Sequence, residues 1–490
     1  PLVMAAGMAV DLASITCKKS DLQQATDAAA LAIVREGKHI TDQEAYQIAK
    51  RFLEGTLTTP YTNLKVLRNG TQFTVQADID GGTQFGSLFG YKKWPVTTKS
   101  SADIAYASYE VALVLDTTGS MAGGKLAAMK DATLGLIEAM SAQVDDEDKL
   151  KFAMVPFATF VNVGPGYGPK FKKGIPKPGT GAAWLDLNAS VVMPQSELSA
   201  GASRFQIYKN LKQEWPGCVE TRYAAGTDVD VDDTPPDVSK PQTLFVPTFA
   251  IDEPDVGYAN SYINSDAKPA DSGAAQKKKR WAKYGVDTTA TGDPLNGGAI
   301  SNLLGVLLDP LTGEPYVPVA ATAVEMESKK KGPGRGCDMQ PIEPLTNDYK
   351  KQMKKIEKLE ASGTTNITEG VAWGTRVLSP GEPFTEGTDK KTGIEKIMIV
   401  LTDGSNVFGN NTTGLGSSYS SNGYLIDNRI GTVGGSSATN EKMNARTLAA
   451  CDVAKAAGTE IYTIRLEEPN VTTGDMLKNC ASDPDHYMDV

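Results

Sequence analysis

Histidine is almost absent from this sequence. Two histidines occur among the 490 residues, His39 and His486, and neither belongs to a metal-ligand pattern. This scarcity argues against a Ser-His-Asp or Cys-His nucleophile and against a zinc site built from histidines. We expect each histidine to be a surface or packing residue.

Cysteine is also scarce, and its spacing excludes two common motifs. The five cysteines include no CxxC pair, which rules out a zinc ribbon and a thioredoxin-like motif. We predict disulfides between Cys218 and Cys337 and between Cys451 and Cys480, which would indicate an oxidising compartment. The alternative, that all five cysteines including Cys17 are reduced buried thiols, stays open because sequence alone does not prove connectivity.

The chain lacks the excess of positive charge that binding to a phosphate backbone requires. Its formal net charge is −10, the wrong sign for a nucleic-acid-binding protein. We interpret the basic runs at residues 277–280 and 329–331 as solvated loop charge. We therefore expect no nucleic-acid partner.

The apolar run at the start of the sequence is too short to cross a bilayer. Residues 1–10, PLVMAAGMAV, are followed by Asp11, whereas a crossing helix needs about 20 apolar residues. We interpret the run as part of a membrane helix that anchors the protein in the inner membrane. The alternative is the start of a buried helix in a soluble protein.

The residues after this run predict a helical pair and then a small sheet. An alanine-rich stripe extends the first helix through residues 20–34, and the spacing of Thr41 and Glu44 predicts a capping box at the start of a second helix. Asn69-Gly70 predicts a β-hairpin, and further strand follows it. A helix that leaves a membrane and precedes a small sheet is a pilin-like arrangement.

Residues 109–120, YEVALVLDTTGS, carry the strongest chemical pattern in the chain. A strand of apolar, mostly β-branched residues stops at Asp116, and hydroxyl residues follow at Thr118 and Ser120. Three oxygen ligands in one short loop suit a hard divalent cation such as Mg²⁺. The alternative is a strand-to-helix turn in which the hydroxyls only cap the next helix.

A phosphoryl-transfer enzyme with Asp116 as nucleophile is disfavoured. Such sites commonly have a second acid two residues later, where this chain has Thr118. The sequence also has no Gly-rich loop ending in Lys-Ser or Lys-Thr to hold phosphates, and acid–base partners are missing. We expect no enzymatic activity.

Strands and helices alternate on both sides of a long interruption. The pattern predicts helices over 124–140, 348–361, 369–378 and 440–457, and strands over 109–116, 149–157, 394–401 and 460–466. This order predicts an α/β fold with a mostly parallel sheet covered on both faces. Ligands of such sheets bind beyond the carboxyl ends of the strands, and Asp116 and Asp403 both end strands, so we expect them on one rim.

The interruption, residues 164–345, is rich in Gly, Pro, Asp and aromatic residues. It is too long for a structureless loop, and we predict an inserted subdomain tied by the first of the two disulfides. Its acidic run at 228–233 lacks the Gly and Glu positions of an EF-hand, so we interpret it as a solvated loop. Trp215 and Trp373 are expected to anchor a core or a subdomain interface, and neither they nor Arg222 are counted as binding residues.

Several short segments carry a family resemblance. DTTGS at 116–120, TNI at 365–367 and TDG at 402–404 resemble the von Willebrand factor type A domain with its metal-ion-dependent adhesion site. Other segments resemble TadG-like proteins of the bacterial tight-adherence (Flp) pilus system over nearly the whole chain. They are the alanine-rich first helix, WPGCVETR at 215–222, FVP at 245–247, DE at 252–253 and TNITEGVAWGTRVLSP at 365–380.

The resemblance implies a Rossmann-like sheet and a set of metal ligands. Asp116, Thr118 and Ser120 would supply the first loop, Thr365 the second, and Asp403, directly or through water, the third. The implied ion is Mg²⁺, with Mn²⁺ or Ca²⁺ as alternatives. An acidic residue of a partner protein would complete its coordination.

These expectations divide the chain into five segments. They are a membrane-anchor remnant with helices (1–58), a small β-rich pilin-like region (59–108), the first part of a von Willebrand A domain (109–163), the inserted subdomain (164–345) and the second part of the domain (346–490).

The predicted function is that of a non-enzymatic component of a bacterial Flp/Tad pilus assembly system. The protein would be anchored in the membrane of the cell envelope, with its bulk in the periplasm or at the cell surface, and would bind pilus or pseudopilin components. The alternative is a surface adhesin that binds host or matrix ligands by the same metal site. A third hypothesis is a structural subunit in which the ion only stabilises the loops.

Overall fold

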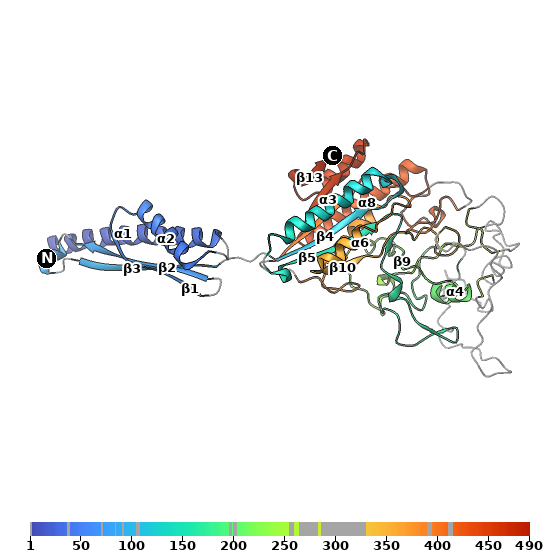
Figure 1. Cartoon of the computed structure of the whole chain (residues 1–490), viewed down its shortest axis with the longest axis horizontal. Helices are drawn as coiled ribbons and strands as arrows, with labels where there is room; N and C mark the ends of the chain where they lie inside the picture. Colours follow the sequence, from blue (N-terminus) through green and yellow to red (C-terminus); the bar gives the residue numbers. More distant parts are fainter. Residues whose placement is uncertain are drawn as a thin grey trace. The chain divides into compact units, whose positions relative to one another are not determined.

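The computed structural model divides the chain into two compact units, Pro1–Ala107 and Ser108–Val490 (Figure 1). His39, the basic run at 277–280 and the first lysine of the run at 329–331 lie outside the described residues, so the expectations for them stay predictions. The described residues are 2–36, 40–69, 72–83, 85–90, 93–103, 108–144, 146–195, 198, 203–253, 259–263, 283–285, 330–389, 394–409 and 415–490.

The first unit packs two helices on one face of a three-stranded antiparallel sheet with strand order β1-β2-β3. Figure 1 shows α1 lying lengthwise along this sheet. Alternate residues of β2 from Phe73 to Ile79 are buried with Leu22 and Ala29 of α1, because successive side chains of a strand point to opposite faces. The elements are α1 (Leu2–Arg35), α2 (Asp42–Thr56), β1 (Tyr61–Asn69), β2 (Gln72–Gly82), a 3-10 turn η1 (Gly86–Phe89) and β3 (Lys93–Asp103).

The local signals predicted for this unit are present. Thr41 caps α2 and exchanges hydrogen bonds with Glu44, as the capping-box spacing predicts. Strands β1 and β2 pair from Asn69 opposite Gln72 onward, which confirms the predicted hairpin. Across the described helices, none combines the length and the apolar content needed to cross a membrane.

The second unit is built on a mostly parallel sheet, which has eight strands among the described residues. The parallel order is β13-β12-β11-β4-β5; β10 and β6 pair antiparallel with β5, and β9 pairs with β6. The strands are β4 (Ser108–Asp116), β5 (Leu150–Phe157), β6 (Val161–Asn162), β9 (Cys218–Val219), β10 (Glu343–Thr346), β11 (Ile394–Thr402), β12 (Thr459–Arg465) and β13 (Tyr487–Asp489). The predicted α/β class with a mostly parallel sheet is confirmed.

The strand order reverses between β4 and β11. If the two-residue strands β6 and β9 are left out, the order β10-β5-β4-β11-β12-β13 corresponds to the doubly wound order 3-2-1-4-5-6, with β10 antiparallel. In open α/β sheets, ligands bind beyond the carboxyl ends of the strands at this reversal. Asp116 is the last residue of β4 and Thr402 the last of β11, so two of the predicted ligand loops follow these two strands.

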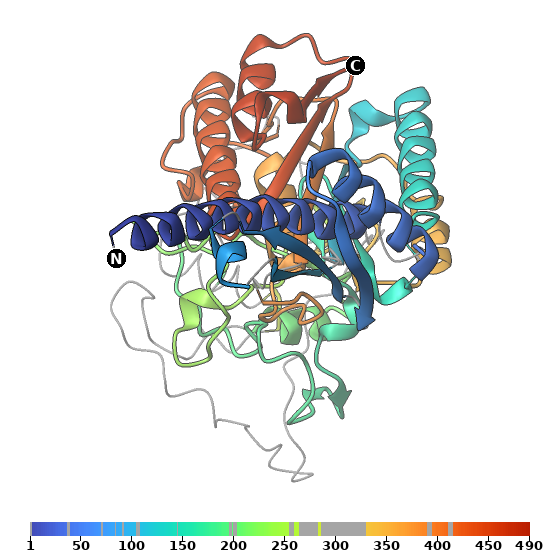
Figure 2. The same ribbon diagram turned by 90° about the vertical axis from the view of Figure 1, so that its left-hand side faces the viewer.

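Helices cover both faces of the sheet. Leu113 of β4 packs in a cluster with α3 and α6, whereas Val114 packs with α7 and α8, and Figure 2 shows α3 and α8 on opposite sides of the strands. Gly374 lets α7 approach closely, because a Cβ there would lie 2.8 Å from Val114 Cγ2. The helices are α3 (Gly124–Ser141), α6 (Tyr349–Ile356), α7 (Ile367–Leu378), α8 (Ser436–Ala456) and α9 (Val471–Cys480). Helix α6 is shorter than the helix predicted over 348–361.

The described part of the insertion continues the core of the sheet and belongs to the same compact unit. The rings of Phe245 and Trp373 lie 4.8 Å apart between centroids, which joins the insertion to α7. Trp215 is buried in the same cluster, so the expectation that both tryptophans anchor a core is confirmed. The insertion contains the short elements β7 (Phe171–Lys172), β8 (Ile175–Pro176) and α4 (Arg204–Asn210).

The acidic run of the insertion is not a solvated loop, and that prediction is wrong. Asp228 and Asp230 form ion pairs with Arg446 on α8, and Asp232 pairs with the buried Arg222. Arg446 is more than 200 residues away from its partners along the chain, so sequence spacing gave no sign of it. The run fastens the insertion to α8.

Both predicted disulfides are present. Cys218–Cys337 joins β9 to the far end of the insertion, and Cys451–Cys480 joins α8 to α9. Cys17 is free and exposed on α1. The alternative of five reduced buried thiols is therefore wrong.

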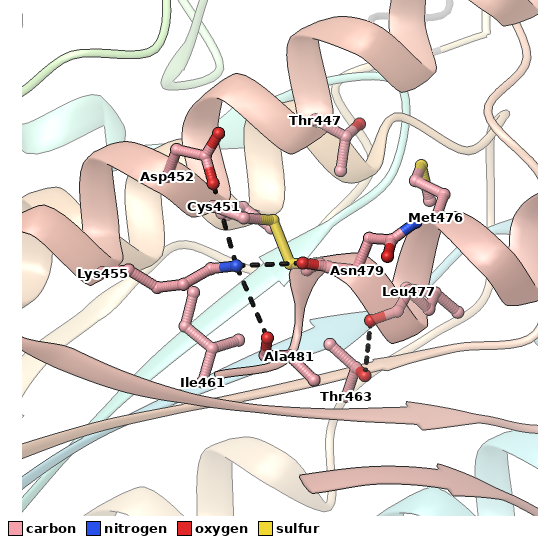
Figure 3. Close-up of a disulfide and its surroundings, with 12 residues drawn as sticks. Thr447, Cys451, Asp452, Lys455, Ile461, Thr463, Met476, Leu477, Asn479 and Ala481 are labelled. Atoms are coloured by element: carbon pink, nitrogen blue, oxygen red, sulfur yellow. Dashed lines mark hydrogen bonds and ion pairs between the residues drawn. A yellow bond between two sulfur atoms is a disulfide. The ribbon is translucent and has the colours of Figure 1, made fainter. Parts of the chain in front are cut away.

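The disulfide between Cys451 and Cys480 is surrounded by polar contacts that hold the same two helices (Figure 3). Lys455 of α8 donates hydrogen bonds to the carbonyl oxygens of Asn479 and Ala481 at the end of α9. Covalent and polar contacts thus fix the carboxyl end of α9 on α8.

Candidate metal centre

The first loop of the candidate site begins at Asp116, whose side chain is fully buried. Strands β4 and β11 pair in parallel up to Leu115 opposite Leu401, which brings Asp116 beside the end of β11. The backbone N–H of Thr118 donates to Asp116 Oδ1 at 2.8 Å, and Thr402 Oγ1 donates to Oδ2 at 2.5 Å. Neutral donors from two loops therefore fix the carboxylate.

The first and third loops meet through Ser120. The hydroxyl oxygens of Thr118 and Ser120 lie 3.0 Å apart, and Ser120 Oγ donates to Asp403 Oδ1 at 2.7 Å. Ser120 is exposed while Thr118 and Asp403 are buried. The predicted ligand residues from two strands, 283 positions apart, thus form one contact chain that reaches the surface.

Thr365 brings the second loop to the same place. A Cβ added to Gly404 would lie 3.1 Å from Thr365 Oγ1 and 3.6 Å from Ser120 Oγ, so both hydroxyls border the same glycine. A larger residue at position 404 would press on the hydroxyl of Thr365. The structure brings all five predicted ligand residues together, and their role as metal ligands stays a prediction.

Backbone hydrogen bonds lock the three loops into one body. The N–H of Gly119 donates to Gly363 O at 3.0 Å, and the N–H of Ser362 donates to Thr117 O at 2.8 Å. The N–H of Val407 donates to the carbonyl of Thr365 at 2.8 Å, which joins the second loop to the third. The oxygens of the site are therefore held before any ligand arrives.

Asn406 supports the second and third loops from beneath. Its Oδ1 accepts from the N–H of Ile367 at 2.8 Å, and its Nδ2 donates to Asn444 Oδ1 at 2.8 Å and to Thr447 Oγ1 at 3.1 Å on α8. The side chain is fully buried. Sequence reasoning missed this residue, although its position two residues after the TDG segment is a usable signal.

Lys125 is the second residue that sequence reasoning missed. It lies in the first turn of α3, and its Nζ donates to Asp403 Oδ2 at 2.9 Å. A lysine in the first turn of a helix that follows a ligand loop is placed at the same rim as the loop. The cluster thus contains two carboxylates and one ammonium.

Burial dominates the electrostatics of Asp116. It raises the pKa of this carboxyl from its usual value to about 6, and the hydrogen bonds from Thr402 and Thr118 offset only part of the rise. A buried carboxylate with a raised pKa gains from a nearby cation. The cluster therefore favours a positive charge beside Asp116.

The chemistry of the donors fits a hard divalent cation. Within the described part of the chain, no cluster of three or more His, Cys, Asp or Glu residues is suited to a metal ion. The set found here instead combines the two carboxylates of Asp116 and Asp403 with the hydroxyls of Thr118, Ser120 and Thr365. Such an all-oxygen set with few charges suits Mg²⁺, which is usually held by one or two carboxylates and retains several waters.

Comparisons with known proteins give distant likenesses only. No family model matches the sequence, and no curated protein matches it significantly. Solved structures that it resembles include von Willebrand factor type A domains of pilus tip proteins. The pilus adhesin SpaC from Lactobacillus rhamnosus GG is also similar, at 10% identity and a TM-score of 0.29, covering 88% of this chain and 32% of that one.

Two further structures are similar at the same level. The von Willebrand factor domain of the type V pili tip protein Mfa5 from Porphyromonas gingivalis has 9% identity and a TM-score of 0.31, covering 79% of this chain and 90% of that one. A von Willebrand factor type A structure from Catenulispora acidiphila has 10% identity and a TM-score of 0.25, covering 88% and 46%. The chain spans about a third of the SpaC structure. Likenesses this weak assign no ligand or partner.

Proposed function

We propose that this protein is a non-enzymatic component of a bacterial pilus assembly system that binds protein partners through a divalent cation. The cation is Mg²⁺, with Mn²⁺ and Ca²⁺ as alternatives, held by Asp116, Thr118, Ser120, Thr365 and Asp403. One observation carries the proposal: three loops far apart in sequence bring two carboxylates and three hydroxyls to the carboxyl ends of β4 and β11.

The donor set explains why such a site recognises an acidic partner. With Asp116 bound directly and Asp403 acting through water, a divalent cation keeps residual positive charge at its first coordination sphere, and the neutral hydroxyl ligands do not reduce it. Ser120 is exposed, so an oxygen from outside can reach the rim at this point. A Glu or Asp side chain of a partner is the hard, charged oxygen ligand that completes the coordination.

The same geometry supports binding rather than catalysis. Both oxygens of Asp116 accept hydrogen bonds and the side chain is fully buried, which leaves it poorly placed to attack a substrate. His486, one of the two histidines, lies in the 3-10 turn η8 (Pro484–His486), and its ring stacks on that of Tyr462 of β12. The function we propose needs neither a nucleophile nor a general base.

The proposed partners are pilus or pseudopilin components of the cell envelope. The two disulfides support an oxidising compartment such as the periplasm or the cell surface. The helix-and-sheet layout of the first unit and the sequence resemblance to TadG-like proteins support a place in the Flp pilus system, with α1 directed to the inner membrane. The alternative is a surface adhesin that binds host or matrix ligands by the same ion.

A pull-down from solubilised envelopes tests the proposal. We expect the wild-type protein to capture pilus components in Mg²⁺ and to lose them in chelator, and Asp403→Ala to lose them in both conditions. Asp131→Asn is the matched control, because it removes one exposed carboxylate from α3 without touching the loops. Capture that is equal in chelator and in Mg²⁺ would leave the structural-subunit hypothesis. Binding to foreign surfaces without pilus components would favour the adhesin.

A further inference from the structure

Lys125 and the proposed cation require the same carboxylate. Lys125 Nζ donates to Asp403 Oδ2 at 2.9 Å, and Ser120 Oγ donates to Asp403 Oδ1 at 2.7 Å. The side chain of Asp403 is fully buried, so both of its oxygens are engaged within the protein. An ion that takes Asp403 as a ligand, directly or through water, meets a positive charge already bonded there.

A second carboxylate lies within reach of the same ammonium. Glu467 Oε2 is 4.0 Å from Lys125 Nζ, and its side chain is 68% exposed. Glu467 is at this rim because β12 runs parallel to β11, and Leu466 N–H donates to Thr402 O at 3.0 Å just beyond the strand end. Lys125 can therefore exchange a buried partner for an exposed one by rotating its flexible side chain.

We propose that the ammonium of Lys125 competes with the divalent cation for Asp403. When the cation binds, Lys125 leaves Asp403 and pairs with Glu467 instead. This inference rests on the proposed cation site and adds a rule for when that site becomes competent. A tethered ammonium has a high effective concentration at Asp403, so free monovalent cations compete poorly with it. A divalent cation, with twice the charge and four further oxygen ligands, can displace it above a threshold concentration.

Calorimetric titration with Mn²⁺ and with Mg²⁺ tests this competition. We expect Lys125→Met to bind the ion about tenfold more tightly or better. In this variant the ion no longer has to break the pair between Lys125 and the buried Asp403, and opposite charges this close near a surface attract by more than the energy of one tenfold step. We expect Glu467→Gln to bind about threefold more weakly, since the displaced ammonium loses an exposed ion pair. In the double variant Lys125→Met/Glu467→Gln, the glutamine substitution should no longer weaken binding of the ion.

Lys130→Met is the matched control. It removes one charge from the same helix, where Lys130 Nζ donates to the carbonyl of Glu357, and its affinity should stay within about twofold of the wild type. Unchanged or weaker binding by Lys125→Met overturns the competition, while loss of binding in Asp403→Ala still upholds the site. Absence of binding in the wild type, in Lys125→Met and in the double variant overturns both proposals.

Chemical labelling supplies a readout that does not depend on affinity. Acylation of the intact protein, followed by mass spectrometry, reports how accessible each lysine is. Saturating Mg²⁺ should raise the labelling rate of Lys125, which leaves the buried Asp403 for an exposed partner, and should leave that of Lys130 unchanged. A Lys125 rate that is insensitive to the ion contradicts the proposed movement.

Discussion

Two buried charge clusters of the second unit show opposite solutions to the same problem. In the insertion, Glu220 is fully buried and pairs with Arg204 and Arg429 at 2.7 Å each, while Tyr419 donates a hydrogen bond to it at 2.5 Å. At the sheet rim, Asp116 is equally buried but is held by hydrogen bonds from neutral groups.

The pKa values of the two buried carboxyls shift in opposite directions. Burial alone would raise the pKa of Glu220, but Arg204 and Arg429 outweigh it and the pKa is lowered. Burial raises the pKa of Asp116 to about 6. Glu220 carries its counter-charge within the fold, whereas Asp116 is held by neutral donors, and the proposed cation would supply its counter-charge.

The largest test removes the internally paired carboxylate. Glu220→Ala leaves Arg204 and Arg429 buried without their partner, which should lower the free energy of unfolding by about 3–5 kcal/mol. Denaturant unfolding followed by tryptophan fluorescence measures this loss. Glu138→Ala on the exposed side of α3 is the control. A loss below about 1 kcal/mol would show that the cluster is not held by these pairs.

Replacing the carboxylate at the rim, Asp116, should instead increase the stability of the protein at neutral pH. Because the folded-state pKa of Asp116 is raised, the folded protein binds a proton that the unfolded chain releases between about pH 4 and pH 6. Stability is therefore lost as pH rises through that window, by up to about 3 kcal/mol for this group. Asp116→Asn should remove the loss and unfold at higher denaturant than the wild type at pH 7 in chelator.

The same comparison at pH 4 is the internal control for Asp116→Asn. There the folded-state carboxyl is protonated and the unfolded one is only about half ionised, so most of the stability difference between the two proteins should be gone. If the variant is less stable than the wild type at pH 7, the ionised carboxylate already has sufficient charge compensation within the fold.

Mg²⁺ should stabilise the folded protein only when Asp116 is intact. Mg²⁺ at ten times its Kd should stabilise the wild type by about 1.4 kcal/mol, because it binds the folded state alone. Asp116→Asn should show no such gain, and Glu138→Ala should show all of it. Thermal unfolding with and without chelator measures the effect. An equal gain in Asp116→Asn would place the ion elsewhere.

The sequence was sufficient to predict the two acids of the rim because a topological rule applies to them. Asp116 ends β4 and Asp403 directly follows β11, and the carboxyl ends of parallel strands share one edge whatever lies between them in the chain. Thr365 follows no strand, and its place came only from the resemblance. The loop pairs that position it, such as Gly119 with Gly363, depend on tertiary contacts.

Residues defined by distant partners escaped prediction. Lys125 and Asn406 lie close in sequence to the ligand loops, but the partners that give them their roles, Asp403 and α8, are distant in sequence. The prediction for the acidic run failed for the same reason, because its partner Arg446 lies more than 200 residues away in the sequence. Local chemistry predicted capping and hairpin geometry well, but charge compensation is a property of the assembled fold.

The smallest expected effect comes from substituting Thr402, because this changes only one hydrogen bond that holds Asp116. Thr402 Oγ1 donates to Asp116 Oδ2, and Thr402→Val removes this donor with little change in shape. One hydrogen bond to a charged group contributes roughly 1 kcal/mol or more, so affinity for Mg²⁺ should fall about fivefold while the pKa of Asp116 rises further. Thr402→Ser keeps the hydroxyl and should bind like the wild type. Equal affinity in the valine and serine variants would mean that the backbone alone positions the carboxylate of Asp116. The rim would then be as rigid as the Glu220 cluster and would differ from it only in lacking an internal counter-charge.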